Sequence, residues 1–464
     1  MARGSNRTGV EENTLAILES IEADDTQDAN DDRLAFLEAV SAASFAPEIP
    51  VPPTSKMYEA VFQILRVGNS LELMMSSYQL LSDLDKHFPQ VYVSKSSAGE
   101  SHELVVADEV WSPFTISSDV ASNTRRAGRE NSGGPLDFSG FTLLIEELAE
   151  VANVKSVKEM KTEHLRNMLL FQYLAHFLEG DFLPRNIMYE ETMNWTILRE
   201  SLLNMLLGSR RMNYKNLMKD CLSILCELYH VHTGISNDHE YLENSIVKPS
   251  EDCNTALAFA FLEVGKSTCI AMQKLLITIM ELDSSKKIAD IKGQTTRTDG
   301  VRTPLLEIIL DELTYNVDIL WPFLQVFNQP KWKLEIIVQY FLKYTAKPSI
   351  RARRSNGSVD DATFNGLLNS FSNDTSAKNI VKKINIGTIQ LLLAHGFQAH
   401  LSLSSQHIEG ILDSKDEQTE SSLVEICKNM ICAFQCLRRT DEKMEILPIV
   451  REALFTAATI LSTN

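Results

Sequence analysis

Apolar residues recur at intervals of three and four along most of this 464-residue chain. Leu165, Leu169, Tyr173 and Phe177 follow this pattern. The spacing places such side chains on one face of an α-helix. Most of the helices that we expect are apolar around more than half of their circumference, so each must pack against several neighbours. Because almost no segment shows the alternation of a β-strand, the sequence predicts an all-α protein.

The sequence predicts roughly sixteen to eighteen helices in series, which favours stacked helix pairs. No tetratricopeptide or ankyrin signature recurs at a fixed spacing. We therefore expect an irregular helical repeat of the armadillo or HEAT type. A compact irregular helical bundle is the alternative, because it would show the same periodicity.

Breaks in the helical pattern divide the chain into six segments. The first fifty residues contain 11 acidic and 3 basic side chains, which predicts a flexible acidic N-terminal segment. In the polar region after the first helices, the short apolar runs Val91–Val93 and Leu104–Val106 are predicted to pair as strands. The six predicted segments are the acidic residues 1–29, the N-terminal helices of 30–90, a long polar loop over 91–140, the central helical repeats of 141–346, a basic loop over 347–361 and the C-terminal helices of 362–464.

Charge and composition exclude several classes of function. The formal net charge of −18 opposes sequence-independent binding to DNA, which depends on contacts between Lys or Arg and phosphate. No apolar run reaches the roughly 18 residues that span a bilayer. No apolar stretch follows Met1–Val10, so we expect no secretory signal. The seven cysteines include no CxxC pair and lie in apolar helical patterns, which indicates reduced core residues in the cytosol or nucleus.

The stretch Ala260–Ser267 matches the relaxed form of a phosphate-binding loop and ends in Gly265-Lys266-Ser267. Such a loop needs a preceding strand and a glycine-rich turn whose amide groups face phosphate. Here Phe261–Val264 continue the helical pattern. We therefore expect a turn between two helices rather than a nucleotide site.

His230, His232 and His239 lie near Asp238 and Glu240, a composition that a metal site could use. However, His230 and His232 are two residues apart, so they point to different faces of a helix. Histidines in the last turn of a helix also interact favourably with its dipole without any metal. The sequence contains no motif of a serine hydrolase, zinc protease or protein kinase. We predict no metal, no cofactor and no catalytic residue, and hence no enzyme.

Aromatic residues cluster where helices are expected to meet, in Trp321-Pro322-Phe323 and at Trp332. Pro322 and Pro330 are each expected to start a helix. Aromatic residues at such junctions usually belong to the core, but the same residue types anchor protein interfaces when they are exposed. Trp321, Phe323 and Trp332 are therefore candidate interface residues.

The basic loop contains Arg351, Arg353, Arg354 and Ser355. A solvated loop is the simplest interpretation, because no aromatic residues are interleaved with the arginines. Phosphorylation at Ser355, a weak nuclear import signal and an auxiliary contact with DNA are the alternatives. These four residues form a candidate regulatory site.

Several long strings of residues resemble a plant family, the negative regulators of systemic acquired resistance, also called inducible suppressors of the non-expressor of pathogenesis-related genes. The similarity extends from about Asn30 to the C-terminus and includes no mechanistic motif. The strings that carry it are Ala29–Val40, Val61–Arg66, Leu71–Leu73, Leu80–Lys86, Leu183–Met188 and Trp321–Val326.

That resemblance implies an armadillo-like fold and a location in the nucleus. It implies a non-enzymatic scaffold or regulatory subunit of a structural-maintenance-of-chromosomes complex of the five/six type. The implied partners are a second helical non-SMC subunit and the chromosome-maintenance ATPases, with DNA contacted indirectly and with no membrane and no small-molecule substrate. The implied roles are the DNA damage response, homologous recombination and restraint of defence-gene transcription.

The residues alone favour a related hypothesis, a scaffold whose stacked helices present grooves to protein partners. The alternative is a direct nucleic-acid-binding protein that uses two basic loops. One contains Arg125, Arg126 and Arg129, and the other contains Arg351, Arg353 and Arg354. An enzyme that uses Gly265-Lys266-Ser267 is the third hypothesis, and the helical pattern of the preceding residues argues against it.

Overall fold

The structure, a computed structural model, describes residues 13–19, 27–46, 49–95, 102–107, 111–115, 135–153, 161–209, 212–233, 252–344, 363–410 and 417–463. The chain forms two compact units, Met1–Ile308 and Ile309–Asn464. The described residues are overwhelmingly helical, which confirms the predicted all-α class. None of the helices in these ranges is long and apolar enough to cross a membrane.

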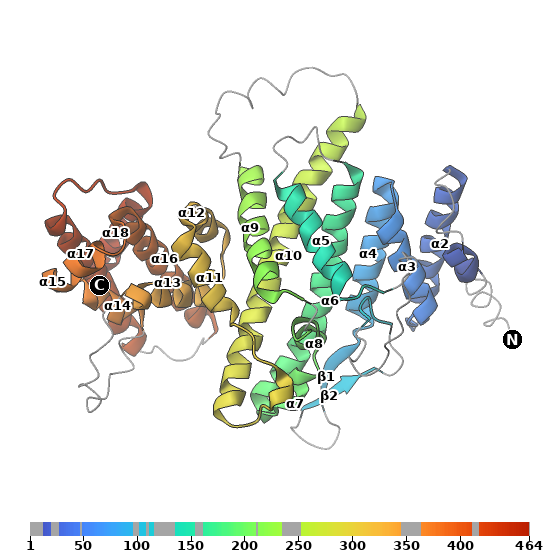
Figure 1. The fold of residues 1–464 in the computed structure, drawn as a ribbon, viewed down its shortest axis with the longest axis horizontal. Helices are drawn as coiled ribbons and strands as arrows, with labels where there is room; N and C mark the ends of the chain where they lie inside the picture. The colour runs from blue at the N-terminus through green and yellow to red at the C-terminus, as the bar shows by residue number, and fades with distance from the viewer. Residues whose placement is uncertain are drawn as a thin grey trace. The chain divides into compact units, whose positions relative to one another are not determined.

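The first unit is built around one long helix, α6. This helix packs against α10, α4, α5 and α3 and against the two strands (Figure 1). Its elements are α2 (Gln27–Phe45), α3 (Ser55–Val67), α4 (Leu71–His87), β1 (Val91–Lys95), β2 (His102–Val106), α5 (Phe138–Ala152), α6 (Thr162–Thr192), α7 (Trp195–Arg199), α8 (Leu202–Leu207), α9 (Tyr214–Thr233), α10 (Asp252–Ile291), the 3₁₀ turn η2 (Arg297–Asp299) and the start of α11 (Leu305–Tyr315).

Helix α6 continues through a proline. Pro184 has no N–H to donate to the carbonyl of Gly180, a loss that usually kinks or ends a helix. The turns on either side of it are buried through Phe182, Arg185 and Met188. Packing therefore holds the helix as far as Thr192, where Met193 adopts a left-handed conformation with φ of 55° and ends it.

Short polar side chains cap the N-terminal ends of several helices and so determine where these helices begin. Thr54, Ser70, Asp137 and Ser201 each accept a hydrogen bond from a backbone N–H in the first turn of the helix that follows. Because Ser201 caps a new helix, the apolar spacing between Trp195 and Leu206, which predicts one helix, instead produces the two short helices α7 and α8.

The predicted strand pair is confirmed. β1 and β2 form an antiparallel hairpin in which Val91 is paired with Val106, and both strands pack against α6. The described ends of the following loop are also packed: Trp111 stacks on Tyr58 with ring centroids 5.8 Å apart, and Phe114 is buried. The polar composition of this segment did not predict that burial.

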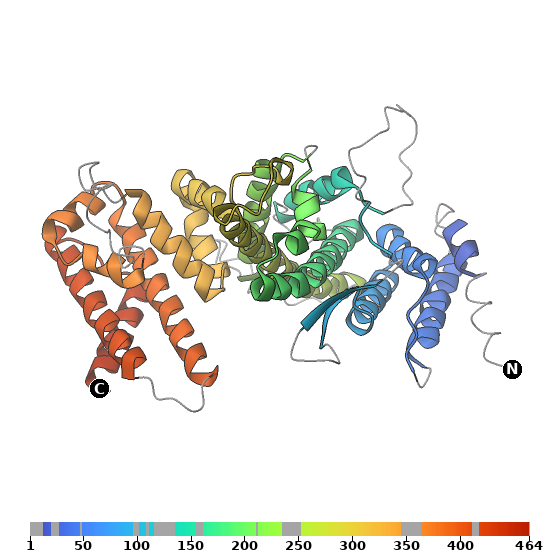
Figure 2. The same ribbon diagram turned by 90° about the horizontal axis from the view of Figure 1, so that it is seen from below.

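The second unit consists of helices that pack around α16 and α17 (orange to red in Figure 2). Helix α16 contacts α13 and α18, and α17 contacts α14, α15 and α18. Its elements after α11 are α12 (Val317–Val326), α13 (Pro330–Tyr344), α14 (Phe364–Ser370), α15 (Asp374–Val381), α16 (Ile386–Gly410), α17 (Glu417–Thr440) and α18 (Pro448–Thr463).

A glycine allows the close approach of α14 to α16. A Cβ atom at Gly396 would lie 2.5 Å from Cε2 of Phe364, whose ring is buried. We expect Gly396→Ala to lower the free energy of unfolding by about 1–3 kcal/mol, because the Phe364 ring must move out of a packed position. Urea unfolding followed by circular dichroism measures the change.

Gly180→Ala is the matched control, since Gly180 is also inside a helix but a Cβ atom there meets no atom within 4 Å. This control should stabilise the protein by about 0.5–1 kcal/mol, because alanine loses less backbone entropy than glycine in a helix. Equal effects of the two substitutions would contradict the close packing at Gly396.

Candidate functional site

The phosphate-loop-like stretch Ala260–Ser267 lies inside the single 40-residue helix α10. The expected turn between two helices was wrong, because the helix continues through Gly265. The carbonyl oxygen of Val264 accepts hydrogen bonds from Thr268 Oγ1 at 2.7 Å and from Gln172 Nε2 at 2.9 Å. Lys266 pairs with Glu263 on the exposed face, with 2.8 Å between Nζ and Oε1. Backbone amides in a helix interior donate to the helix itself, so they cannot surround a phosphate.

We expect the full-length protein to show no saturable binding of a fluorescent ATP analogue. Lys266→Met should leave that titration unchanged, because Lys266 is an exposed side chain paired only along the helix. Saturable binding that disappears in Lys266→Met would contradict the helical assignment of this stretch.

The three histidines whose composition resembles a metal site are only partly within the described residues. His230 and His232 lie at the end of α9, and His239 lies outside the described residues. Across the ranges that the structure describes, no group of His, Cys, Asp and Glu is arranged to hold a metal ion.

The three candidate aromatic residues differ in exposure. Phe323 and Trp332 are buried at 1% and 7% exposure, so they contribute to the core of the second unit. Trp321 is 39% exposed, and its ring meets the buried His395 edge-on at 6.2 Å. Pro330 starts α13 as expected, but Pro322 lies inside α12 instead of starting it. Whether any of these aromatic residues contacts a partner stays a prediction.

The candidate regulatory residues Arg351, Arg353, Arg354 and Ser355 lie outside the described residues. Their role stays a prediction from the sequence.

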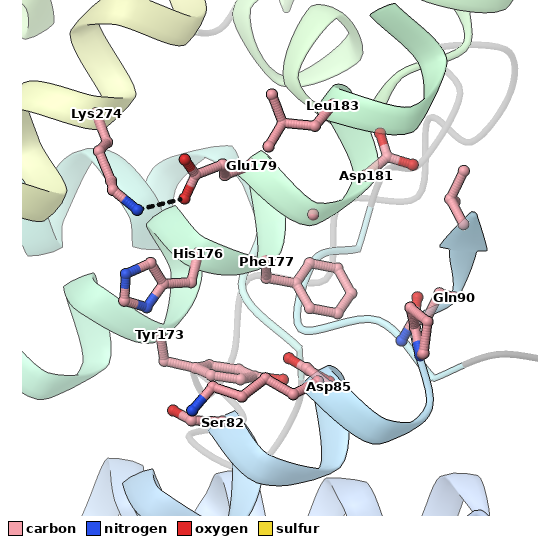
Figure 3. A pocket seen from close by; sticks show the side chains of 14 residues that line it. Ser82, Asp85, Gln90, Tyr173, His176, Phe177, Glu179, Asp181, Leu183 and Lys274 are labelled. Carbon is pink, nitrogen blue, oxygen red and sulfur yellow. Dashed lines mark hydrogen bonds and ion pairs between the residues drawn. The ribbon is translucent and has the colours of Figure 1, made fainter. Parts of the chain in front are cut away.

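A pocket that the sequence did not predict lies where α4, β1, α6 and α10 meet (Figure 3). Its volume is about 460 Å³, which is within the range of about 300–1,000 Å³ typical of ligand sites. The residues that line it are Ser82, Asp85, Lys86, Pro89, Gln90, Val91, Tyr173, His176, Phe177, Glu179, Gly180, Asp181, Leu183 and Lys274.

Three oxygen atoms in this pocket are buried and make no hydrogen bond of good geometry: Asp85 Oδ1, Ser82 Oγ, which lies near Tyr78, and the Tyr173 hydroxyl. Burial raises the pKa of Asp85 to about 7, and the nearby Tyr173 hydroxyl offsets part of that increase. Although the Tyr173 hydroxyl is close enough to affect the pKa of Asp85, no hydrogen bond of acceptable geometry joins the two groups. Figure 3 shows both side chains on the same wall of the pocket, facing Phe177.

The other carboxylates of the pocket already have partners. Asp181 accepts from Arg185 Nε at 3.0 Å and from the backbone N–H of Leu202 at 2.7 Å, which ties α6 to α8. Glu179 pairs with Lys274 across the mouth, with 3.3 Å between Oε2 and Nζ (Figure 3). Asp85 therefore differs from its neighbours in that one of its carboxyl oxygens is buried and unpaired.

The sequence contains a signal for this pocket. Leu81 and Asp85 are four residues apart, and Leu84 precedes Asp85, so the carboxyl lies beside the buried stripe of α4. An acidic residue at a position where the helical period predicts an apolar one indicates either an unfavourable buried charge or a functional site. The remaining pocket residues, on α6 and α10, are brought close only by the tertiary fold.

Comparisons with known proteins identify related chains. The SNI1 middle domain matches residues 87–329, and the SNI1 C-terminal domain matches residues 345–464. A protein from Arabidopsis thaliana named "Negative regulator of systemic acquired resistance SNI1" is 47% identical over 459 residues, which cover 98% of this chain and 95% of that protein. No solved structure is significantly similar.

Proposed function

The chain belongs to the SNI1 family, and from that premise we propose that it is a negative regulator of systemic acquired resistance in plants. The observation that carries this proposal is the 47% identity, which extends over 98% of the chain and therefore includes both compact units. A shared function is expected when the whole chain, rather than one module, is related.

We propose that the protein regulates without catalysis, by binding other proteins. Large apolar side chains are exposed on well-formed helices: Leu183 and Ile187 are 43% and 48% exposed on α6, and Phe455 is 75% exposed on α18. Leu183 and Ile187 are one helical turn apart, so they form a continuous apolar surface. Exposed apolar surface of this kind is typical of sites that a partner covers.

A more specific proposal concerns the protein complex in which this binding takes place. We propose a nuclear scaffold subunit of a chromosome-maintenance complex of the SMC five/six type, together with a second helical non-SMC subunit and the ATPases of that complex. Such a subunit would act in the DNA damage response and homologous recombination. The support is the resemblance of the strings Leu80–Lys86 and Trp321–Val326 to the family, together with the helical fold, which offers extended surfaces to partners.

Contact with DNA is proposed to be indirect. The net charge of −18 opposes a large contribution from phosphate contacts. Cationic side chains on the described helices are in part paired with acids, as Lys343 is with Asp311 at 2.9 Å and Lys274 with Glu179. Such pairs reduce the positive potential that a nucleic acid would meet.

Complementation of Arabidopsis thaliana plants that lack their own SNI1 tests this proposal. Expression of the chain should return defence-gene transcripts in uninduced plants to the wild-type level, and should restore wild-type survival on a DNA-damaging agent. The Arabidopsis protein, expressed at the same level, is the control. Transcripts that stay elevated with the chain stably expressed would contradict the regulatory role, and restored transcripts without restored survival would contradict the chromosome-maintenance role.

A further inference from the structure

The pocket between α4, α6 and α10 combines an apolar wall with buried oxygen atoms. Phe177, Leu183, Pro89 and Val91 supply apolar surface. Asp85 Oδ1, Ser82 Oγ and the Tyr173 hydroxyl are buried, and none of them makes a hydrogen bond of good geometry, although Tyr173 lies near Asp85 and Tyr78 lies near Ser82. A buried carboxyl without a partner is costly, because burial removes its water without replacing the lost hydrogen bonds. An occupant that donates hydrogen bonds to these oxygens would remove that cost.

We propose that this pocket receives an arginine side chain of a protein partner, whose guanidinium group pairs with the Asp85 carboxylate. The proposal rests on the protein-binding role described above. It adds the residue that binds and the chemistry that it recognises.

An arginine fits the pocket in charge and in hydrogen bonding. A guanidinium has five N–H donors in a fixed plane, so it can bind a carboxylate through two of them while others reach hydroxyl oxygens such as those of Ser82 and Tyr173. Its apolar stem would lie along Phe177 and Leu183, as long cationic side chains commonly do on apolar surfaces. Lysine, with three donors on a compact ammonium, matches this set of oxygens less well.

The surroundings of the pocket favour a protein over a small cation. Leu183 lines the pocket and is 43% exposed, and Ile187 extends the same face of α6 by one turn. The hairpin that begins at Val91 also exposes Val106, at 50%, and it packs against α6. Apart from the Glu179–Lys274 ion pair, the side chains bordering the mouth are therefore apolar, and residues flanking an arginine in a partner would cover them.

The charge balance around Asp85 makes binding depend on pH. The other titratable groups that line the pocket are Lys86 on α4, Tyr173, His176, Glu179 and Asp181 on α6, and Lys274 on α10. Tyr58 on α3 does not line the pocket but is close enough to interact electrostatically with Asp85. Glu179 and Lys274 neutralise each other, and Asp181 is paired with Arg185. Because the Asp85 pKa is about 7, ionised Asp85 becomes less abundant below neutral pH, and arginine binding should weaken by about tenfold from pH 8 to pH 6.

Selection of peptides on the full-length protein tests the proposal. The probe is a phage-displayed library of random 12-residue peptides, selected on the wild-type protein with counter-selection on Asp85→Asn. We expect the selected peptides to share one arginine flanked by apolar residues. For a synthesised peptide of that set, fluorescence anisotropy should show at least tenfold weaker binding to Asp85→Asn and a similar loss when citrulline replaces the arginine. The citrulline peptide should bind Asp85→Asn only slightly more weakly than it binds the wild-type protein, because each change already removes the same pair.

Two variants serve as controls. Asp83→Asn removes a charge from the same helix outside the pocket and should leave the affinity unchanged. His176→Gln should keep the pH dependence if Asp85 is the titrating group. Peptides without a shared basic residue, equal binding to Asp85→Asn, or a pH dependence that disappears in His176→Gln would overturn the proposal. These outcomes do not depend on plant complementation, so failure of either test is distinguishable from failure of the other.

Discussion

Asp283→Ala is expected to lower the free energy of unfolding by about 3–5 kcal/mol, because it leaves a buried guanidinium without its counter-charge. Asp283 Oδ1 accepts from Arg302 Nη2 at 2.7 Å and from Nε at 3.0 Å, and Oδ2 accepts from the backbone N–H of Leu305 at 2.8 Å. The two side chains are only 9% and 10% exposed. The carboxylate thus binds the segment before α11 to α10 through three hydrogen bonds.

Urea unfolding measures this effect, with Ser284→Ala as the control on the adjacent, exposed position. The control should change the free energy of unfolding by less than about 0.5 kcal/mol. Arg302→Ala should also be strongly destabilising, and the double variant should lose less than the sum of the two. Additive losses would show that Asp283 and Arg302 do not stabilise each other.

Asp85→Asn is expected to stabilise the protein at pH 8, since it removes an unpaired buried charge. The pKa of Asp85 is raised from 3.8 to about 7, so the folded state holds the proton more tightly than the unfolded state does. Stability therefore falls as the pH rises through this window and is constant above it. This rise in the pKa corresponds to about 4 kcal/mol, which is the upper limit for the increase in the free energy of unfolding that Asp85→Asn produces at pH 8.

Thermal unfolding of wild type and Asp85→Asn at pH 5 and pH 8 measures this difference. The midpoint of the variant should exceed that of the wild type by more at pH 8 than at pH 5. Asp83→Asn, whose carboxylate is partly exposed and bonded to Gln79 and Lys86, should show no such trend. An equal increase in the unfolding midpoint at both pH values, or a decrease at pH 8, would contradict the buried and unpaired state of Asp85.

Periodicity predicted the fold class and most of the helices, because amphipathic spacing reflects burial directly. The short apolar runs Val91–Val93 and Leu104–Val106 predicted the strand pair of β1 and β2. Periodicity was wrong at two places: Ser201 caps a new helix inside an unbroken apolar pattern, and Pro322 lies within α12 instead of starting a helix. The six predicted segments stay predictions.

Candidate sites were harder to predict than helices. Trp321, Phe323 and Trp332 were chosen by residue type, yet two of the three are buried, since residue type does not determine which face of a helix is covered. The sequence did not identify Asp85 as a site residue, although Asp85 interrupts the apolar stripe of α4. The pocket around it also requires Tyr173, 88 positions later on α6, and Lys274 on α10. Sites assembled from distant helices require the tertiary fold.

Affinity purification of the tagged protein from plant nuclear extract, followed by a salt wash and mass spectrometry, tests most directly the claim that this chain acts as a protein-binding subunit. We predict recovery of the chromosome-maintenance ATPases and a second helical subunit in amounts comparable to the tagged chain, with no change after nuclease treatment. Recovery of the chain without the ATPases, or loss of all partners after nuclease treatment, would contradict this account.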